Sequence, residues 1–292
     1  MSVPRWVAER TGLPRTAHDA GTIGAAGCTV NRFAVALMPD SGGHPRKPVA
    51  GVDAPPPHLL LVARRMTRPG EHMALTTYTP VITVFAAGRE WTLERAADLQ
   101  TLWDNMVEAD FGDDERLPYW TELWPSSLVL ADWLHDNAGR IRGRTCLDMG
   151  CGLGLCSLVG QWLGARVTGM DYEPEALFHA RRNAERNRVP QPLWTVMDWR
   201  APAVRRHAAD LVWGGDIMYE RRFVTPVLDF LDHVLAPCGA AWVAEPGRTV
   251  YNHFRETLDA RGWHARRVLS SETASLYEQP ESVTVHLWEI TR

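Results

Sequence analysis

The run from Thr145 to Gly154, which reads Thr-Cys-Leu-Asp-Met-Gly-Cys-Gly-Leu-Gly, restricts the fold of this chain more than any other segment. It predicts a β-strand that ends just after Asp148 and opens through a glycine-rich turn directly into a helix. Glycine at 150, 152 and 154 lets the backbone turn tightly and approach a ligand with no Cβ atom in the way. The free N–H groups and the positive dipole end of the helix would face that ligand. The run therefore predicts the first strand, turn and helix of an α/β sheet.

The chain after Gly143 continues to alternate between strand and helix patterns. Strands are expected at Thr145–Met149, Arg166–Asp171, Leu193–Met197, Asp210–Gly214 and Ala240–Ala244, with helices at residues 154–163, 174–187, 223–235 and 249–261. The tail adds strands at Trp263–Leu269 and Val283–Ile290, which suggest a closing hairpin. This pattern predicts a Rossmann-like, doubly wound seven-stranded sheet with an antiparallel C-terminal strand, whose ligands bind outside the carboxyl ends of the strands.

The part of the chain before this sheet divides into two regions. Residues 1–70 contain Pro55-Pro56-Pro57 and little apolar periodicity, so we expect a disordered extension or a misassigned start. Residues 71–140 are expected to form a small N-terminal β-hairpin, from Val81–Phe85 and Glu90–Leu93, followed by helices at residues 97–109 and after Pro125. The ligand-binding domain is then expected at residues 141–292.

Composition argues against several other classes of protein. A formal net charge of −4 gives no basic field that would suggest nucleic-acid binding. No stretch reaches the ~18–20 apolar residues that a membrane span requires. Five cysteines without a C-x₂-C pair predict neither a metal site nor a disulfide framework. We therefore expect a cytoplasmic protein with no metal, membrane or nucleic-acid partner, and we favour a monomer.

Asp171 ends the second expected strand of the sheet. An acid at this place can accept hydrogen bonds from both hydroxyls of a ribose; the alternative is a strand-end acid that caps the helix at Pro174. Residues 150–154 follow G-x-G-x-G, whereas dinucleotide sites follow G-x-G-x-x-G. Asp148, two residues before the first glycine, is poorly placed for a pyrophosphate and well placed for a cationic amino group. The site therefore suits an adenosyl group that carries an α-amino acid.

From about Leu117 to its end, the chain resembles the seven-strand, class I methyltransferases that use S-adenosyl-L-methionine. The resemblance implies that Asp148 lies near the methionyl part, that Asp171 holds the ribose, and that Asp198 and Trp199 frame the adenine. Trp199 has an alternative interpretation as a packing aromatic. The expected cofactor-binding residues are Trp124, Asp148, Gly150, Cys151, Gly152, Gly154, Asp171, Tyr172, Asp198, Trp199 and Gly215.

Three short strings indicate a narrower resemblance. Leu123–Ser127, Gly215–Tyr219 and Pro246–Arg248 are similar to a branch that methylates lysines of specific proteins, including the electron-transfer-flavoprotein β-subunit lysine methyltransferases. In that branch the D-x-x-Y loop faces the target lysine, which implies catalytic roles for Asp216 and Tyr219, and the tryptophan that matches Trp124 lies against the cofactor. Relatives with the third string usually read Asp-Pro-Gly-Arg, whereas this chain has Glu245 before Pro246.

A lysine acceptor must lose a proton before it can attack the methyl group, because its pKa is about 10.4. Asp216 would stabilise the ammonium, so we expect it to capture and align the lysine, while Tyr219 directs the amine through its hydroxyl or ring face. The alternative for both residues is a loop that caps the helix near Phe223. Glu245 and Arg248 are expected substrate residues; Arg248 binds an acidic substrate segment or pairs with Glu245.

These observations favour an enzyme that transfers a methyl group from S-adenosyl-L-methionine to the lysine ε-amine of a protein partner, with S-adenosyl-L-homocysteine as the product. A second hypothesis is methylation of a small amine or a pyridine-like nitrogen on the same fold. A third is a nicotinamide-dependent oxidoreductase, which the glycine spacing and Asp148 disfavour. A fourth is a methyltransferase-like scaffold without catalysis, which the joint presence of the cofactor residues and the D-x-x-Y loop disfavours.

Overall fold

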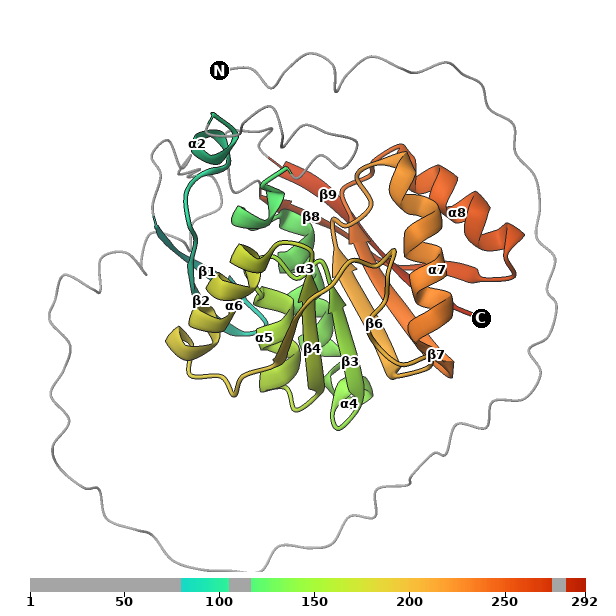
Figure 1. The fold of residues 1–292 in the computed structure, drawn as a ribbon, viewed down its shortest axis with the longest axis horizontal. Coiled ribbons are helices and arrows are strands. Elements are labelled where there is room, and N and C mark those ends of the chain that lie inside the picture. Colours follow the sequence, from blue (N-terminus) through green and yellow to red (C-terminus); the bar gives the residue numbers. More distant parts are fainter. Residues whose placement is uncertain (1–79, 105–116, 275–281) are drawn as a thin grey trace, which may run out of the picture. The chain divides into compact units, whose positions relative to one another are not determined.

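A seven-stranded sheet organises the part of the chain that the computed structural model describes, namely residues 80–104, 117–274 and 282–292 (Figure 1). These residues all belong to one compact unit, residues 53–292. The strands are β3 (Thr145–Met149), β4 (Arg166–Asp171), β5 (Leu193–Val196), β6 (Ala209–Gly215), β7 (Leu235–Glu245), β8 (His264–Ala274) and β9 (Ser282–Thr291). The expectation for residues 1–70 lies outside the described residues.

The strand order in the sheet is β5-β4-β3-β6-β7-β9-β8. Neighbouring strands from β5 to β7 are parallel, whereas β9 pairs antiparallel with both β7 and β8. The predicted fold class, including the antiparallel C-terminal strand, is therefore confirmed. The chain runs outward from β3 through β4 to β5 and then returns to the other side of β3 as β6. This reversal makes the carboxyl ends of β3 and β6 the switch point at which such sheets bind ligands.

Helices cover the sheet through two separate apolar clusters. The helices are α2 (Leu99–Asp104), α3 (Pro125–Asp136), α4 (Ala138–Ile141), α5 (Leu155–Trp162), α6 (Pro174–Arg186), α7 (Val224–Val234) and α8 (Val250–Ala260). One cluster contains Cys146 of β3 together with buried residues of α3 and α5, and the other contains Leu147 together with buried residues of α7 and α8. Successive side chains of β3 therefore enter opposite cores, as the two-residue period of a strand requires.

The N-terminal hairpin consists of β1 (Val81–Ala86) and β2 (Arg89–Glu94) and confirms the expected pair of strands. Its turn places Ala87 and Gly88 at φ 52° and 74°, the pair of positive values that a tight two-residue hairpin uses. Trp91 is fully buried, and its indole N–H donates a 2.9 Å hydrogen bond to the carbonyl of Ala86. The hairpin thus contributes to the core next to α3, where the Ala87 N–H donates to Asp132 of that helix at 2.6 Å.

Most other expected elements agree with the structure to within a few residues, but β7 begins five residues before the expected strand and β8 ends five residues after it. The helix expected at residues 97–109 begins as α2, and its later part lies outside the described residues. A 3-10 turn at Tyr119–Thr121 and the short helix α4 were not expected. In the residues that the structure describes, no helix is both long and apolar enough to cross a membrane.

Candidate active site

One pocket at the carboxyl ends of β3, β4 and β6 collects nearly all of the expected site residues. All of the expected cofactor-binding and catalytic residues line it: Trp124, Asp148, Gly150, Cys151, Gly152, Gly154, Asp171, Tyr172, Asp198, Trp199, Gly215, Asp216 and Tyr219. They come from five separate stretches of the chain, so only the folded sheet brings them together. The two expected substrate residues, Glu245 and Arg248, are not among the residues that line it.

The glycine turn between β3 and α5 forms the floor of this pocket. Gly150, Gly152 and Gly154 have φ values of 67°, 49° and 89°, a region that residues with a side chain rarely adopt. A Cβ atom on Gly152 would lie 3.3 Å from the Trp120 carbonyl oxygen, and one on Gly154 would lie 2.9 Å from Cβ of Ala180. Glycine is therefore required both for the backbone conformation and for the space.

Asp148 is buried beneath this turn, with 2% of its surface exposed. It lies two residues from Cys146 on β3 and therefore faces the same side of the sheet, where Ser157 of α5 donates a 2.6 Å hydrogen bond to Oδ2. Burial raises the pKa of the Asp148 carboxyl to about 7, and the nearby charge of Asp171 acts in the same direction. A cationic group of a ligand would favour the ionised form of this carboxyl.

Asp171 ends β4 and holds two backbone segments at once. Its Oδ2 accepts a 2.8 Å hydrogen bond from the N–H of Gly152, and its Oδ1 accepts a 3.1 Å bond from the N–H of Glu173, just before α6. Burial raises the pKa of Asp171, and the backbone hydrogen bonds oppose that shift. Each carboxylate oxygen has a second acceptor position, so both can also accept from hydroxyl groups in the pocket.

Asp198 lies after β5 and is held by Arg200, a pocket residue that sequence reasoning missed. The Arg200 Nε donates to both carboxylate oxygens of Asp198, at 3.0 and 2.8 Å, and Nη2 donates to Oδ2 at 2.6 Å. The Arg200 guanidinium also lies 5.9 Å from the ring centre of Tyr172. The spacing of two residues between Asp198 and Arg200 carries no recognisable signal in the sequence.

Five aromatic rings, here called the aromatic wall, run in edge-to-face contact along the pocket: Trp124, Tyr119, Tyr219, Phe223 and Trp199. Consecutive rings have centre-to-centre distances of 5.8, 5.4, 5.0 and 5.5 Å. The wall joins the loop before α3 to the loops after β5 and β6. Tyr119 and Phe223 were not expected in the site. Tyr119 follows a proline and Phe223 precedes a helix, and an aromatic residue at either place is as typical of a packed core as of a pocket.

The aromatic wall changes the chemistry of its central tyrosine. Burial raises the pKa of Tyr219 far above its ordinary value, and the charges of Glu220 and Asp171 contribute to this shift. The hydroxyl therefore stays protonated at neutral pH. Tyr219 can act as a hydrogen-bond donor or acceptor or through its ring face, and it is poorly suited to act as a phenolate base.

Asp216 follows β6 with φ 57°, a strained value for a residue other than glycine. Its carboxylate is 5% exposed and accepts two hydrogen bonds from Arg248, from Nε at 2.8 Å and from Nη2 at 3.2 Å. The backbone N–H of Asp216 donates to the carbonyl of Ala244 at 2.8 Å, which fixes the loop against the end of β7. The forked guanidinium fixes the plane of this carboxylate, which lines the same pocket as the aromatic wall.

Glu245, which was expected to pair with Arg248 or to contact substrate, is only 2% exposed and has other partners. Its Oε2 accepts hydrogen bonds from the backbone N–H groups of Gly247 and Arg248, at 2.6 and 3.0 Å, and its Oε1 accepts from the indole of Trp288 at 3.1 Å. The side chain of Arg248 therefore pairs with Asp216 and not with Glu245. Glu245 shapes the turn that carries Arg248.

The described residues contain no group of three or more histidine, cysteine, aspartate or glutamate side chains that could hold a metal ion. The pocket instead combines the glycine turn, two buried carboxylates and the aromatic wall. The buried Asp148 carboxyl, the acceptor oxygens of Asp171 and the aromatic wall fit a ligand with a cationic group, hydroxyl groups and a flat ring.

Comparisons with known proteins agree with this chemistry. Residues 146–239 match the family model described as a methyltransferase domain. The chain is 29% identical over 161 residues to the ribosomal protein L11 methyltransferase of Vibrio campbellii. This match covers 53% of this chain and 53% of that protein. It is also 29% identical over 142 residues to the electron transfer flavoprotein beta subunit lysine methyltransferase of Homo sapiens. This second match covers 46% of this chain and 52% of that protein.

The chain thus spans about half the length of these two curated relatives. Among solved structures, it is similar to a ribosomal protein L11 methylase from Lactobacillus delbrueckii subsp. bulgaricus, with a TM-score of 0.43 and 17% sequence identity over 56% of this chain and 76% of that one.

Proposed function

We propose that this chain, whose residues 146–239 match a methyltransferase domain, is a class I methyltransferase that uses S-adenosyl-L-methionine to methylate the ε-amine of a lysine in a protein substrate. Two of the matched relatives carry names that specify a protein as the methyl acceptor, and one of these names specifies lysine. The D-x-x-Y loop of this chain, Asp216 to Tyr219, lines the same pocket as the glycine turn. The proposal assigns the glycine-turn end of that pocket to the cofactor and the Asp216 end to the acceptor.

At the cofactor end, the two buried carboxylates have separate roles in this proposal. Asp148 takes the cationic amino group of the methionyl part, since its raised pKa means that a nearby positive charge favours ionisation. Asp171 accepts the ribose hydroxyls with the acceptor positions that Gly152 and Glu173 leave open. Trp199 offers a ring face to the adenine, which orients a purine through ~0.5–1.5 kcal/mol of stacking.

At the acceptor end, the residues of this chain lower the cost of removing a proton from the lysine amine. When bound, S-adenosyl-L-methionine supplies a methyl group on a positively charged sulfur. The lysine must arrive neutral, which at pH ~7 costs about 4.6 kcal/mol for an ordinary side chain. The aromatic wall excludes water around the amine and so lowers its pKa. Tyr219, which stays protonated, aligns the amine through its hydroxyl or ring face.

Asp216 captures and orients the incoming ammonium before the proton is released to water. The pair with Arg248 occupies part of the carboxylate and leaves further acceptor positions on its two oxygens. Because Arg248 balances the charge of Asp216, the carboxylate holds the ammonium less strongly than an isolated acid would. This balance matters, since a strongly bound ammonium would resist deprotonation.

The observation that carries the proposal is the presence of Asp216, Tyr219 and the glycine turn on one pocket. The test is incubation of the purified chain with S-adenosyl-L-methionine carrying a tritiated methyl group and a lysate from cells that lack this chain. We expect tritium in a protein band, and methyllysine after acid hydrolysis of that band. The Asp216→Asn variant serves as the matched control and should label the band far more weakly.

Two outcomes would contradict the proposal. Tritium in small molecules alone would indicate the second hypothesis, a small amine or ring nitrogen as acceptor. Labelled protein that yields a methylated residue other than lysine would retain the protein substrate and reject the lysine.

A further inference from the structure

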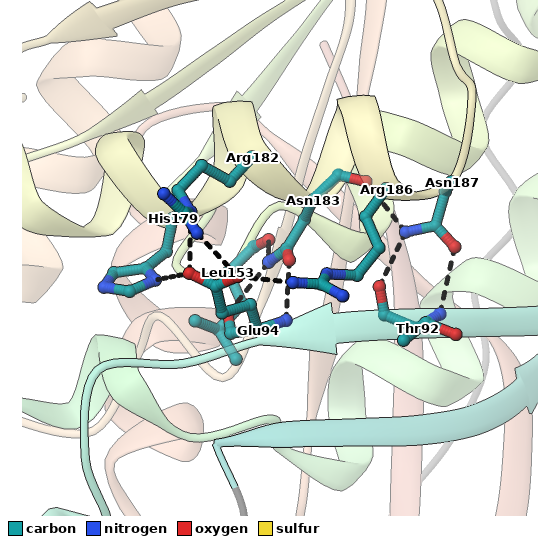
Figure 2. A network of polar contacts seen from close by, with 8 residues as sticks. All are labelled: Thr92, Glu94, Leu153, His179, Arg182, Asn183, Arg186 and Asn187. Carbon is teal, nitrogen blue, oxygen red and sulfur yellow. Dashed lines mark hydrogen bonds and ion pairs between the residues drawn. The ribbon is translucent and has the colours of Figure 1, made fainter.

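We propose that Asn183 is a positioning residue for the cofactor, because its side chain ties the N-terminal hairpin to the glycine turn. Asn183 lies on α6 and is fully buried. On one side it contacts Glu94, the last residue of β2, and on the other side it contacts Leu153 (Figure 2). Through this amide the hairpin would set the shape of a turn that binds the cofactor.

Three hydrogen bonds fix the orientation of the Asn183 amide. Its oxygen accepts from the N–H of Glu94 at 2.6 Å. Its nitrogen donates to the carbonyl of Glu94 at 3.1 Å and to the carbonyl of Leu153 at 3.0 Å. Since the Glu94 N–H requires an acceptor, the amide cannot be flipped without loss of this contact, and its two donors remain directed at the two carbonyls. A fully buried amide with these partners satisfied is held rigidly.

The bond to Leu153 acts at a sensitive point of the turn. Leu153 lies between Gly152 and Gly154, both of which line the pocket in the left-handed conformation. The N–H of Gly154 donates to the carbonyl of Cys151 at 2.8 Å. The peptide that joins residues 153 and 154 is therefore held at its oxygen by α6 and at its nitrogen by the turn itself. This peptide leads directly into the first turn of α5, whose free N–H groups start at the pocket.

A second route from Glu94 reaches the same turn. The Glu94 carboxylate contacts three cationic or titratable side chains of α6, namely Arg182 at 2.6 Å, Arg186 at 2.5 Å and His179 at 3.7 Å (Figure 2). The ring of His179 stacks on Trp120, with ring centres 5.9 Å apart. The backbone of Trp120 in turn approaches Gly152 closely. The end of the hairpin thus supports the glycine turn from two sides.

Asn187, one helical turn after Asn183, provides a matched control. Its side chain forms the same kind of bridge to the hairpin (Figure 2). Its amide oxygen accepts a 2.9 Å hydrogen bond from the N–H of Thr92, and its amide nitrogen donates a 2.7 Å bond to the carbonyl of Thr92. Its remaining side-chain bond, at 2.8 Å, goes to the carbonyl of Asn183 on its own helix. Removal of either amide weakens hairpin docking, but only Asn183 contacts the glycine turn.

The experiment compares Asn183→Ala, Asn187→Ala and the unchanged chain by isothermal titration with S-adenosyl-L-homocysteine and by thermal unfolding without ligand. We expect both variants to unfold at lower temperature. Only Asn183→Ala should bind S-adenosyl-L-homocysteine more weakly, by ~5–10-fold, the effect of one lost hydrogen bond. If Asn183→Ala does not fold, Asn183→Ser is measured in its place by the same criteria.

Unchanged affinity in the Asn183 variant would overturn the proposal. An equal loss of affinity in both variants would also overturn it, because hairpin docking in general would then explain the effect. The titration uses no methyl acceptor, so its outcome is independent of whether the substrate is a lysine.

Discussion

Asp148 and Asp171 are both buried strand-end carboxylates, yet their surroundings give them different properties. Asp171 accepts two backbone hydrogen bonds that compensate for part of its desolvation, whereas Asp148 is bound through the hydroxyl of Ser157. Sequence position identified both acids, because each was expected at or next to the end of a strand. The sequence did not reveal that Asp171 also holds Gly152, since a side chain that contacts a residue 19 positions earlier depends on the packed sheet.

Asp148→Asn should change how the stability of the ligand-free protein depends on pH. The carboxyl ionises near pH 3.8 in the unfolded chain and near pH 7 in the folded one. Between these values the folded chain binds more protons, so the contribution of Asp148 to stability falls as pH rises and stays low above pH 7. The full difference is on the order of 4 kcal/mol. Urea unfolding at pH ~5 and ~8 measures this effect. The free energy of unfolding should fall less between the two pH values in the variant than in the unchanged chain.

Parallel pH profiles for the unchanged chain and Asp148→Asn would show that this carboxyl does not titrate as described. The same variant should also lose affinity for S-adenosyl-L-homocysteine, and more strongly at high pH, where the native carboxylate is ionised and attracts the amino group.

Asp171→Ala should weaken binding of S-adenosyl-L-homocysteine by ~2–3 kcal/mol, the scale of hydrogen bonds to a charged group. The matched control is Asp210→Ala, because Asp210 also accepts a backbone hydrogen bond, from Thr145 at 2.9 Å, but at the amino ends of the strands. Titration calorimetry on both variants gives the comparison. Near-native affinity in Asp171→Ala would remove the ribose role.

Among the elements, β3 and β4 lie at the residues expected from the sequence, because the glycine turn directly follows β3 and the helix start at Pro174 closely follows β4. The expected β7 strand was too short, since its first part, from Leu235, includes Pro237 and Gly239 and lacks an apolar pattern. The 3-10 turn at Tyr119–Thr121 was missed for a similar reason. Its stability comes from distant partners such as the carbonyl of Ala97, which accepts a hydrogen bond from Thr121.

Gly154→Ala should destabilise the protein more than a glycine substitution with backbone strain alone. Gly154 has φ 89° and no room for a Cβ atom, whereas Gly262 has φ 75° and nothing within 4 Å of the place where its Cβ would be. Left-handed strain alone costs ~1–2 kcal/mol, and overpacking adds ~1–3 kcal/mol. In urea unfolding, Gly154→Ala should therefore have a lower free energy of unfolding than Gly262→Ala. Equal losses in the two variants would contradict the steric argument.

At the scale of the whole molecule, the hairpin and the pocket are connected, although the sequence suggested a boundary near residue 140. Arg95, which follows β2, forms a buried ion pair with Glu122. Glu122 also accepts a 3.0 Å hydrogen bond from the N–H of Leu99 and lines the pocket. No local pattern announces these pairs, nor the pair of Asp216 with Arg248, because each joins residues more than 20 positions apart.

Glu122→Gln should destabilise the fold by ~3–5 kcal/mol, because it removes the carboxylate partner of a buried arginine. Arg266→Ala is the control, since Arg266 is 74% exposed and its partner Glu289 keeps a second ion pair, with Arg140. The cost of this substitution should be ~1 kcal/mol or less. Chemical denaturation measures both. A similar loss of unfolding free energy in the two variants would show that the buried ion pair stabilises the fold no more than an exposed one does.

The division of one pocket into a cofactor end and an acceptor end is tested most directly by Asp216→Asn. The measurement pairs titration of S-adenosyl-L-homocysteine with the rate of tritium transfer to lysate protein, on the same preparation. We expect binding within ~3-fold of the unchanged chain and a transfer rate reduced by ~100-fold or more, because the variant loses the charge that aligns the acceptor. Equal loss of binding and transfer would place Asp216 in the cofactor site or the fold, and unchanged transfer would remove it from the reaction.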